Sequence, residues 1–76
     1  MENIYKYKDQ IIDTPLAHKL YDMLMKISND EYYVLCVMAE LHTDDEIKKM
    51  LSVLDAGVTD KNIIALVPYD IDEGRI

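Results

Sequence analysis

Residues 54–70, LDAGVTDKNIIALVPYD, constrain the fold of this chain more than any other stretch. Gly57 is placed to end a preceding helix in the left-handed conformation, and Pro68 follows a run of five apolar residues. A five-residue apolar run between turn residues and a proline fits a short buried strand. It fits a short helix capped by Thr59 and stopped by Pro68 as well. The fold class depends on which of the two forms.

The first clear helix signal covers residues 14–28. Thr14 is a good N-cap, and Pro15 suits the first helical position, where its missing N–H has no helical partner to lose. Apolar side chains then recur at helical spacing at Leu16, Leu20, Leu24 and Ile27. This pattern predicts an amphipathic helix.

The second clear helix signal covers residues 44–56. Thr43 and Glu46 form a Thr-x-x-Glu capping box, in which each side chain accepts a hydrogen bond from the other residue's backbone N–H. The buried side of the predicted helix carries Ile47, Met50, Leu51 and Leu54.

Residues 32–41, YYVLCVMAEL, are apolar almost without interruption. Periodicity does not separate a buried strand from a buried helix here. The last residues of the run would accept a helix, whereas the aromatic and β-branched residues at its front favour a strand that is covered on both faces of a parallel sheet. Together with the helix over residues 44–56 and a strand over residues 62–68, it makes a βαβ unit, whose crossover needs about a dozen residues. We therefore predict a small α/β domain in which this unit follows the helix over residues 14–28.

The alternative is an all-α chain with a C-terminal half similar to a helix-turn-helix. Residues 50–67, MLSVLDAGVTDKNIIALV, resemble the second and third helices of helix-turn-helix domains, with glycine in the turn. The resemblance implies DNA binding, but the charge opposes it. From residue 43 onward there are 8 acidic and 4 basic side chains, and Asp60 would stand among the residues that read bases. We expect no nucleic-acid binding.

The length of the chain limits its organisation. A chain of 76 residues allows a single small domain, with residues 1–13 as an arm or edge strand and residues 71–76 as a polar tail. Such a small core is marginally stable, so we expect a homo-oligomer. The lone Cys36 excludes an internal disulfide and is expected in the core. Because the sequence has no apolar leader and no membrane-length apolar run, we predict a cytoplasmic protein without membrane contact.

Polar side chains that could bind a partner gather at one edge of the predicted sheet. Both parallel strands end at this edge, and open α/β sheets bind ligands beyond the carboxyl ends of their strands. The predicted partner edge consists of Glu40, His42, Thr43, Tyr69 and Asp70. Glu40 and His42 alone are too few for a metal centre, so we predict neither a metal nor a cofactor.

The predicted function is protein–protein contact. The sequence contains no phosphate-binding loop, no paired catalytic carboxylates and no nucleophile–base arrangement, so we predict that the protein is not an enzyme and has no catalytic residues. Its net charge of −7 is compatible with a basic protein partner. We predict a small acidic regulatory or inhibitory accessory protein of a bacterium or phage. The alternatives are a helix-turn-helix DNA-binding regulator and an acidic decoy that occupies a nucleic-acid-binding surface.

Overall fold

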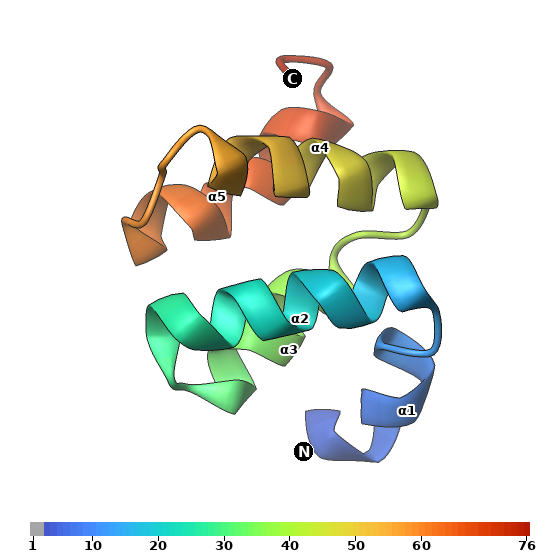
Figure 1. Ribbon diagram of the computed structural model, residues 1–76. Helices are drawn as coiled ribbons and strands as arrows, with labels where there is room; N and C mark the ends of the chain where they lie inside the picture. Colours follow the sequence, from blue (N-terminus) through green and yellow to red (C-terminus); the bar gives the residue numbers. More distant parts are fainter. Residues whose placement is uncertain (1–2) are drawn as a thin grey trace.

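Helices account for all the regular structure in the computed structural model, which describes residues 3–76 (Figure 1). In chain order they are the 3-10 helix η1 (Ile4–Tyr7) and the α-helices α1 (Lys8–Ile11), α2 (Pro15–Ser28), α3 (Glu31–Ala39), α4 (Asp44–Asp55) and α5 (Lys61–Asp72). No strand occurs in residues 3–76. The α/β prediction is therefore wrong, and the all-helical alternative is confirmed.

The helices predicted over residues 14–28 and 44–56 are confirmed as α2 and α4. The Thr14 side chain caps α2, and Thr43 and Glu46 form the predicted capping box at the start of α4. Both helices were predictable because a side-chain cap and an amphipathic stripe point to the same structure.

The strand predicted over residues 32–41 is the helix α3. Its N-cap is Asp30, whose Oδ1 accepts a hydrogen bond of 3.3 Å from the backbone N–H of Tyr33. α3 contacts η1, α1, α2 and α5. These neighbours bury Val34, Leu35, Val37 and Met38. A helix that is covered on several sides is apolar nearly all round, which gives the same sequence pattern as a buried strand.

The strand predicted over residues 62–68 is the first part of α5. Asp60, rather than Thr59, is the N-cap. Its Oδ1 accepts hydrogen bonds from the backbone N–H groups of Asn62, at 2.8 Å, and Ile63, at 3.4 Å. The cap starts a helix that continues through the whole apolar run.

Pro68 lies inside α5 and does not end it, since the helix runs on to Asp72. The polar tail predicted over residues 71–76 therefore begins within the helix. A proline in a helix interior removes one backbone hydrogen bond and costs about 3 kcal/mol. The side chain of Pro68 is fully buried, and the apolar surface it buries offsets part of this cost.

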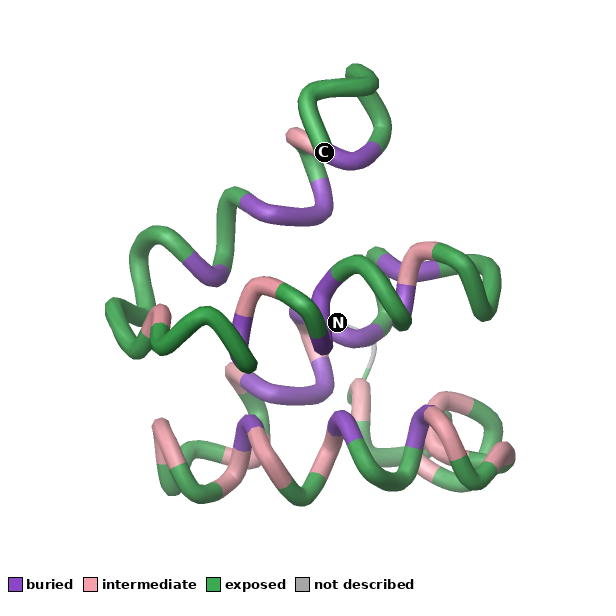
Figure 2. Tube along the Cα trace, turned by 45° about the horizontal axis from the view of Figure 1, so that its top comes forward, coloured by how far each residue is buried: buried purple, intermediate pink, exposed green. Residues whose placement is uncertain are grey.

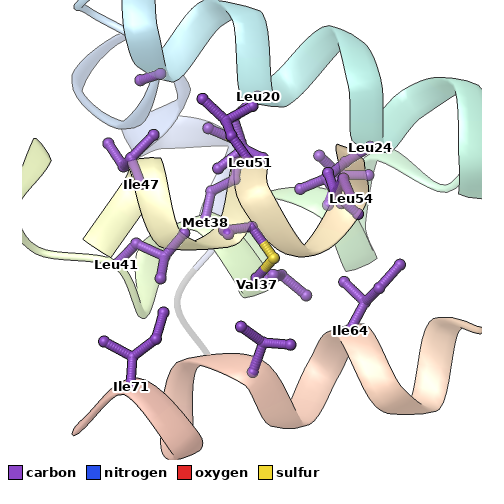
Figure 3. Packing of buried hydrophobic residues seen from close by; sticks show 14 residues of the cluster. Leu20, Leu24, Val37, Met38, Leu41, Ile47, Leu51, Leu54, Ile64 and Ile71 are labelled. Atoms are coloured by element: carbon purple, nitrogen blue, oxygen red, sulfur yellow. The ribbon is translucent and has the colours of Figure 1, made fainter. Parts of the chain in front are cut away.

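The four longer helices form a closed ring of contacts, because α2 and α5 each contact both α3 and α4. Buried positions recur along each of these helices between exposed ones (Figure 2). The apolar core inside the ring takes side chains from all four helices (Figure 3). These include Leu20 and Leu24 of α2, Val37 and Met38 of α3, Ile47, Leu51 and Leu54 of α4, and Ile64 and Ile71 of α5.

We call η1 and α1 together the arm. The edge strand predicted within residues 1–13 is wrong for residues 3–13, where the backbone is helical over the arm. Residues 1 and 2 lie outside the described residues. Lys8 of the arm pairs with Glu31 of α3, with 2.7 Å between Nζ and Oε2. Tyr21 of α2 donates its hydroxyl to the same Oε2, so three elements meet at one carboxylate.

Hydrogen bonds from Lys8 and Tyr21 lower the pKa of Glu31 below its ordinary value of 4.5. A carboxyl group with a lowered folded-state pKa stabilises the fold above its ordinary pKa and loses this effect as the pH falls through the folded value. We expect Glu31→Gln to lower the midpoint of urea unfolding at neutral pH, and the difference from wild type to be lost as the pH falls through the lowered pKa of Glu31.

Asp45→Asn is the matched control for this measurement. Asp45 is exposed and lies in the first turn of α4, as Glu31 lies in the first turn of α3. Both substitutions remove a charge that interacts favourably with a helix dipole, but only Glu31 joins three elements. Equal midpoint shifts in the two variants would contradict a stabilising role for the cluster.

Candidate functional site

The five residues of the predicted partner edge lie in three different places, since residues 3–76 contain no sheet to bring them together. His42 and Thr43 line a hollow of about 440 Å³ between the arm and the starts of α2 and α4. Glu40 and Tyr69 line a second hollow of about 330 Å³ between α3 and α5. Asp70 pairs with Arg75 in the segment that follows α5.

Two residues of the first hollow, His42 and Thr43, take part in the capping of α4. Glu46 Oε1 accepts backbone hydrogen bonds from His42, at 2.8 Å, and Thr43, at 3.1 Å. These bonds, that from His42 above all, lower the pKa of the Glu46 carboxyl. Thr43 Oγ1 in turn accepts from the Glu46 backbone N–H. These hydrogen bonds thus hold the start of α4 in place.

The second hollow is a mostly apolar groove, which we call the α3–α5 groove. Its lining consists of Tyr33, Cys36, Val37 and Glu40 from the α3 side and Ala65, Leu66 and Tyr69 from α5. Near the start of both helices, Tyr33 of α3 donates its hydroxyl to the backbone carbonyl of Lys61 of α5 at 2.6 Å. Towards the end of both helices, Glu40 and Tyr69 line the groove together. The two helices therefore run in the same direction along it.

One exposed face of α5 adds large apolar side chains beside this groove. Ile63, Leu66 and Tyr69 follow one another at a spacing of three residues, and their exposed fractions are 51%, 58% and 57%. We call these three residues the α5 stripe. The opposite face of the helix is buried in the core at Ile64, Val67, Pro68 and Ile71. α5 is thus anchored through one apolar face and exposes a second.

Charge is distributed unevenly along the groove. Glu40 is the C-cap of α3 and lies near Tyr69, four residues before the C-cap of α5 at Glu73. Helix C-termini carry partial negative charge. The C-terminal ends of α3 and α5 and the carboxylate of Glu40 therefore lie at the same end of the groove. At the other end, the Lys61 Nζ lies 6.0 Å from the centre of the Tyr33 ring. Burial raises the pKa of the Tyr33 hydroxyl, and the charge of Asp60 adds to this effect.

Cys36 was predicted to lie in the core, but it is only partly buried and lines the α3–α5 groove. Residues 3–76 contain no group of three or more His, Cys, Asp or Glu side chains that could hold a metal ion. None of their helices is long and apolar enough to span a bilayer.

The turn between α4 and α5 has the sequence order of a helix-turn-helix. Gly57 has a positive φ of 95°, as predicted for the residue that ends α4. The exposed residues at the start of α5 are Lys61, Asn62 and Ile63. The carboxylate of Asp60 stands directly before them, where a DNA-binding helix would approach phosphates.

Comparisons with protein-family models, curated proteins and solved structures found no match to this chain.

The α5 stripe was not predicted from the sequence. Ile63 and Leu66 were assigned to a buried strand, because they stand in an unbroken apolar run. One signal could have found them: on a helix, residues 63, 66 and 69 lie on a different face from residues 64, 67 and 71. Two apolar faces on one helix indicate more apolar surface than a single core contact needs.

We expect Tyr33→Phe to lower the free energy of unfolding by about 0.5–1.5 kcal/mol, because it removes the hydrogen bond to the Lys61 carbonyl and keeps the ring. Urea unfolding followed by circular dichroism measures the change. Tyr32→Phe is the control, since Tyr32 is 53% exposed. A loss of stability in Tyr32→Phe as large as that in Tyr33→Phe would contradict a role for this bond.

Proposed function

We propose that the protein acts by binding another protein through the α5 stripe and the adjoining α3–α5 groove. The observation that carries the proposal is the exposure of Ile63, Leu66 and Tyr69 on one face of a single helix. Large apolar side chains that gather on a surface are typical of protein interaction sites, whereas scattered ones are not. Tyrosine is also enriched at such sites.

The architecture of α5 supports this proposal. A helix that is held in the core by Ile64, Val67 and Ile71 presents its outer face in a fixed orientation. A surface of fixed shape loses little conformational entropy when it binds. We propose a regulatory or inhibitory role for this contact, in the cytoplasm of a bacterium or in a phage-infected cell. That the protein is not an enzyme stays a prediction.

DNA binding is the second candidate function, and the helix–turn–helix order of α4 and α5 favours it. Two observations oppose it. The outer face of α5 carries Ile63, Leu66 and Tyr69 in place of basic residues, and the chain has a net charge of −7. The net negative charge is compatible with the alternative of an acidic decoy for a nucleic-acid-binding surface, but that function does not account for the exposed apolar stripe.

We expect no shift of a mixed-sequence DNA duplex in a gel titration at low salt, because low salt strengthens contacts between basic residues and phosphates and this surface has few basic residues. A shift that weakens steeply as salt is added, and that is lost in Lys61→Ala, would favour the DNA-binding function over protein binding.

We expect Leu66→Gln and Tyr69→Gln each to weaken binding to the partner by about 30-fold, the effect of losing an interface residue that contributes about 2 kcal/mol. Both side chains are more than half exposed, so stability should change by no more than about 0.5 kcal/mol. Affinity capture from a bacterial lysate, followed by titration of each purified captured protein, measures the effect.

Tyr5→Gln is the matched control, because Tyr5 is 46% exposed and lies on the arm. A protein that wild type and Tyr5→Gln retain, and that both α5 variants lose, would support the proposal. Capture of the same proteins at equal affinity by all four chains would contradict it.

A further inference from the structure

We infer that the partner of the α3–α5 groove is an amphipathic helix with a lysine or arginine at one end of its apolar face. This inference rests on the proposed function. The apolar side chains of the helix would lie on the α5 stripe. Its basic side chain would lie beside Glu40 and Tyr69, at the acidic end of the groove.

The walls of the groove indicate that the occupant is helical. Both walls are helices, whose backbone N–H and C=O groups are bonded within the helix over most of their length. An extended peptide would find no row of free backbone groups to pair with, as it does at the edge of a sheet. A helix satisfies its own backbone groups and offers a row of apolar side chains at i, i+3 or i+4 and i+7, which can pack along the row formed by residues 63, 66 and 69.

The charges at one end of the groove indicate that the occupant is basic there. Glu40 lines the groove, and within residues 3–76 no cation lies within ion-pair distance of its carboxylate. Asp70 and Glu73 are close by in sequence to Tyr69, and Arg75 pairs with both of them, at 3.0 and 2.5 Å. Of these three carboxylates, Glu40 is thus the one that a basic partner can reach without displacing Arg75.

Two further effects favour a cation at this place. α3 ends at Glu40 and α5 ends close to Tyr69, and the partial negative charge of helix C-termini attracts cations. The Tyr69 side chain is more than half exposed, and an accessible aromatic ring attracts a lysine or arginine. A second copy of this chain fits less well, because each copy carries a net charge of −7 and like charges oppose association.

Two model peptides of about 18 residues test the partner chemistry, a length at which an amphipathic sequence forms a helix in part. Both carry leucines at i, i+3, i+4 and i+7 and differ only in having lysines or glutamates elsewhere. We expect the lysine peptide to bind about tenfold tighter than the glutamate peptide, with an affinity that falls as salt is added. Fluorescence anisotropy of labelled peptide measures the affinities.

Cys36 gives an independent measure of where the peptide binds, because it lines the groove and is the only cysteine in the chain. We expect the lysine peptide to slow alkylation of Cys36 by iodoacetamide. Leu66→Gln should reduce binding of both peptides. Glu40→Gln should weaken the lysine peptide alone, and more than Asp55→Asn, which removes the same charge from the exposed end of α4 outside the groove.

The basic character of the partner and its position in the groove are tested separately. Equal affinities for the two peptides, or equal effects of Glu40→Gln and Asp55→Asn, would overturn the basic partner and leave the proposed protein contact standing. Binding that leaves Cys36 fully reactive would overturn the placement in the groove. Self-association in sedimentation that protects Cys36 would show a second copy as the occupant. The proposed function itself fails only through the capture experiment, where the stripe variants would bind as wild type does.

Discussion

The burial of α3 is the constraint on which the rest of the structure depends. This nine-residue helix contacts the arm, α2 and α5, and four of its side chains are buried. Because α3 is short and covered on several sides, its own backbone hydrogen bonds contribute little to its stability, and packing against its neighbours contributes most. The neighbours in turn need its apolar surface to complete their own burial. The arm depends on α3 in a different way: its two short helices have no buried residues, and Lys8 connects them to the start of α3 through an ion pair with Glu31.

The same arrangement leaves α5 with more apolar surface than the core can cover. α5 contacts α3 and α4 on one side, and the chain provides no further helix to cover its other side within residues 3–76. The groove follows from the packing of α5 against α3, and the acidic end of the groove follows from the parallel direction of the two helices. The shape, the apolar character and the charge of this surface therefore have one common origin.

The sequence predicted those elements in which two local signals agreed. α2 and α4 each have a side-chain cap followed by an amphipathic stripe, so both were found within one residue at their N-terminal ends. α3 and the first part of α5 were predicted as strands, because a helix surrounded by apolar neighbours and a buried strand have the same unbroken apolar pattern. The aspartates at 30 and 60, which cap these two helices, were the local signals that could have separated the two structures.

Glu40 and Tyr69 were predicted to lie near each other and both line the groove, although the sheet edge used to place them does not exist. Ile63 and Leu66 could not be recognised as exposed, because exposure depends on which neighbours the fold supplies.

Pro68 links the geometry of the α5 stripe to the integrity of the whole fold. With a proline at its eighth position, the α5 segment would form very little helix as an isolated peptide. Its helical geometry, and with it the alignment of Ile63, Leu66 and Tyr69, is maintained only while the Pro68 face is docked in the core. A partner that recognises this alignment therefore distinguishes the folded chain from a partly unfolded or truncated one. Loosening of the core at a distance from the groove would therefore abolish the proposed recognition without any change in the residues of the stripe.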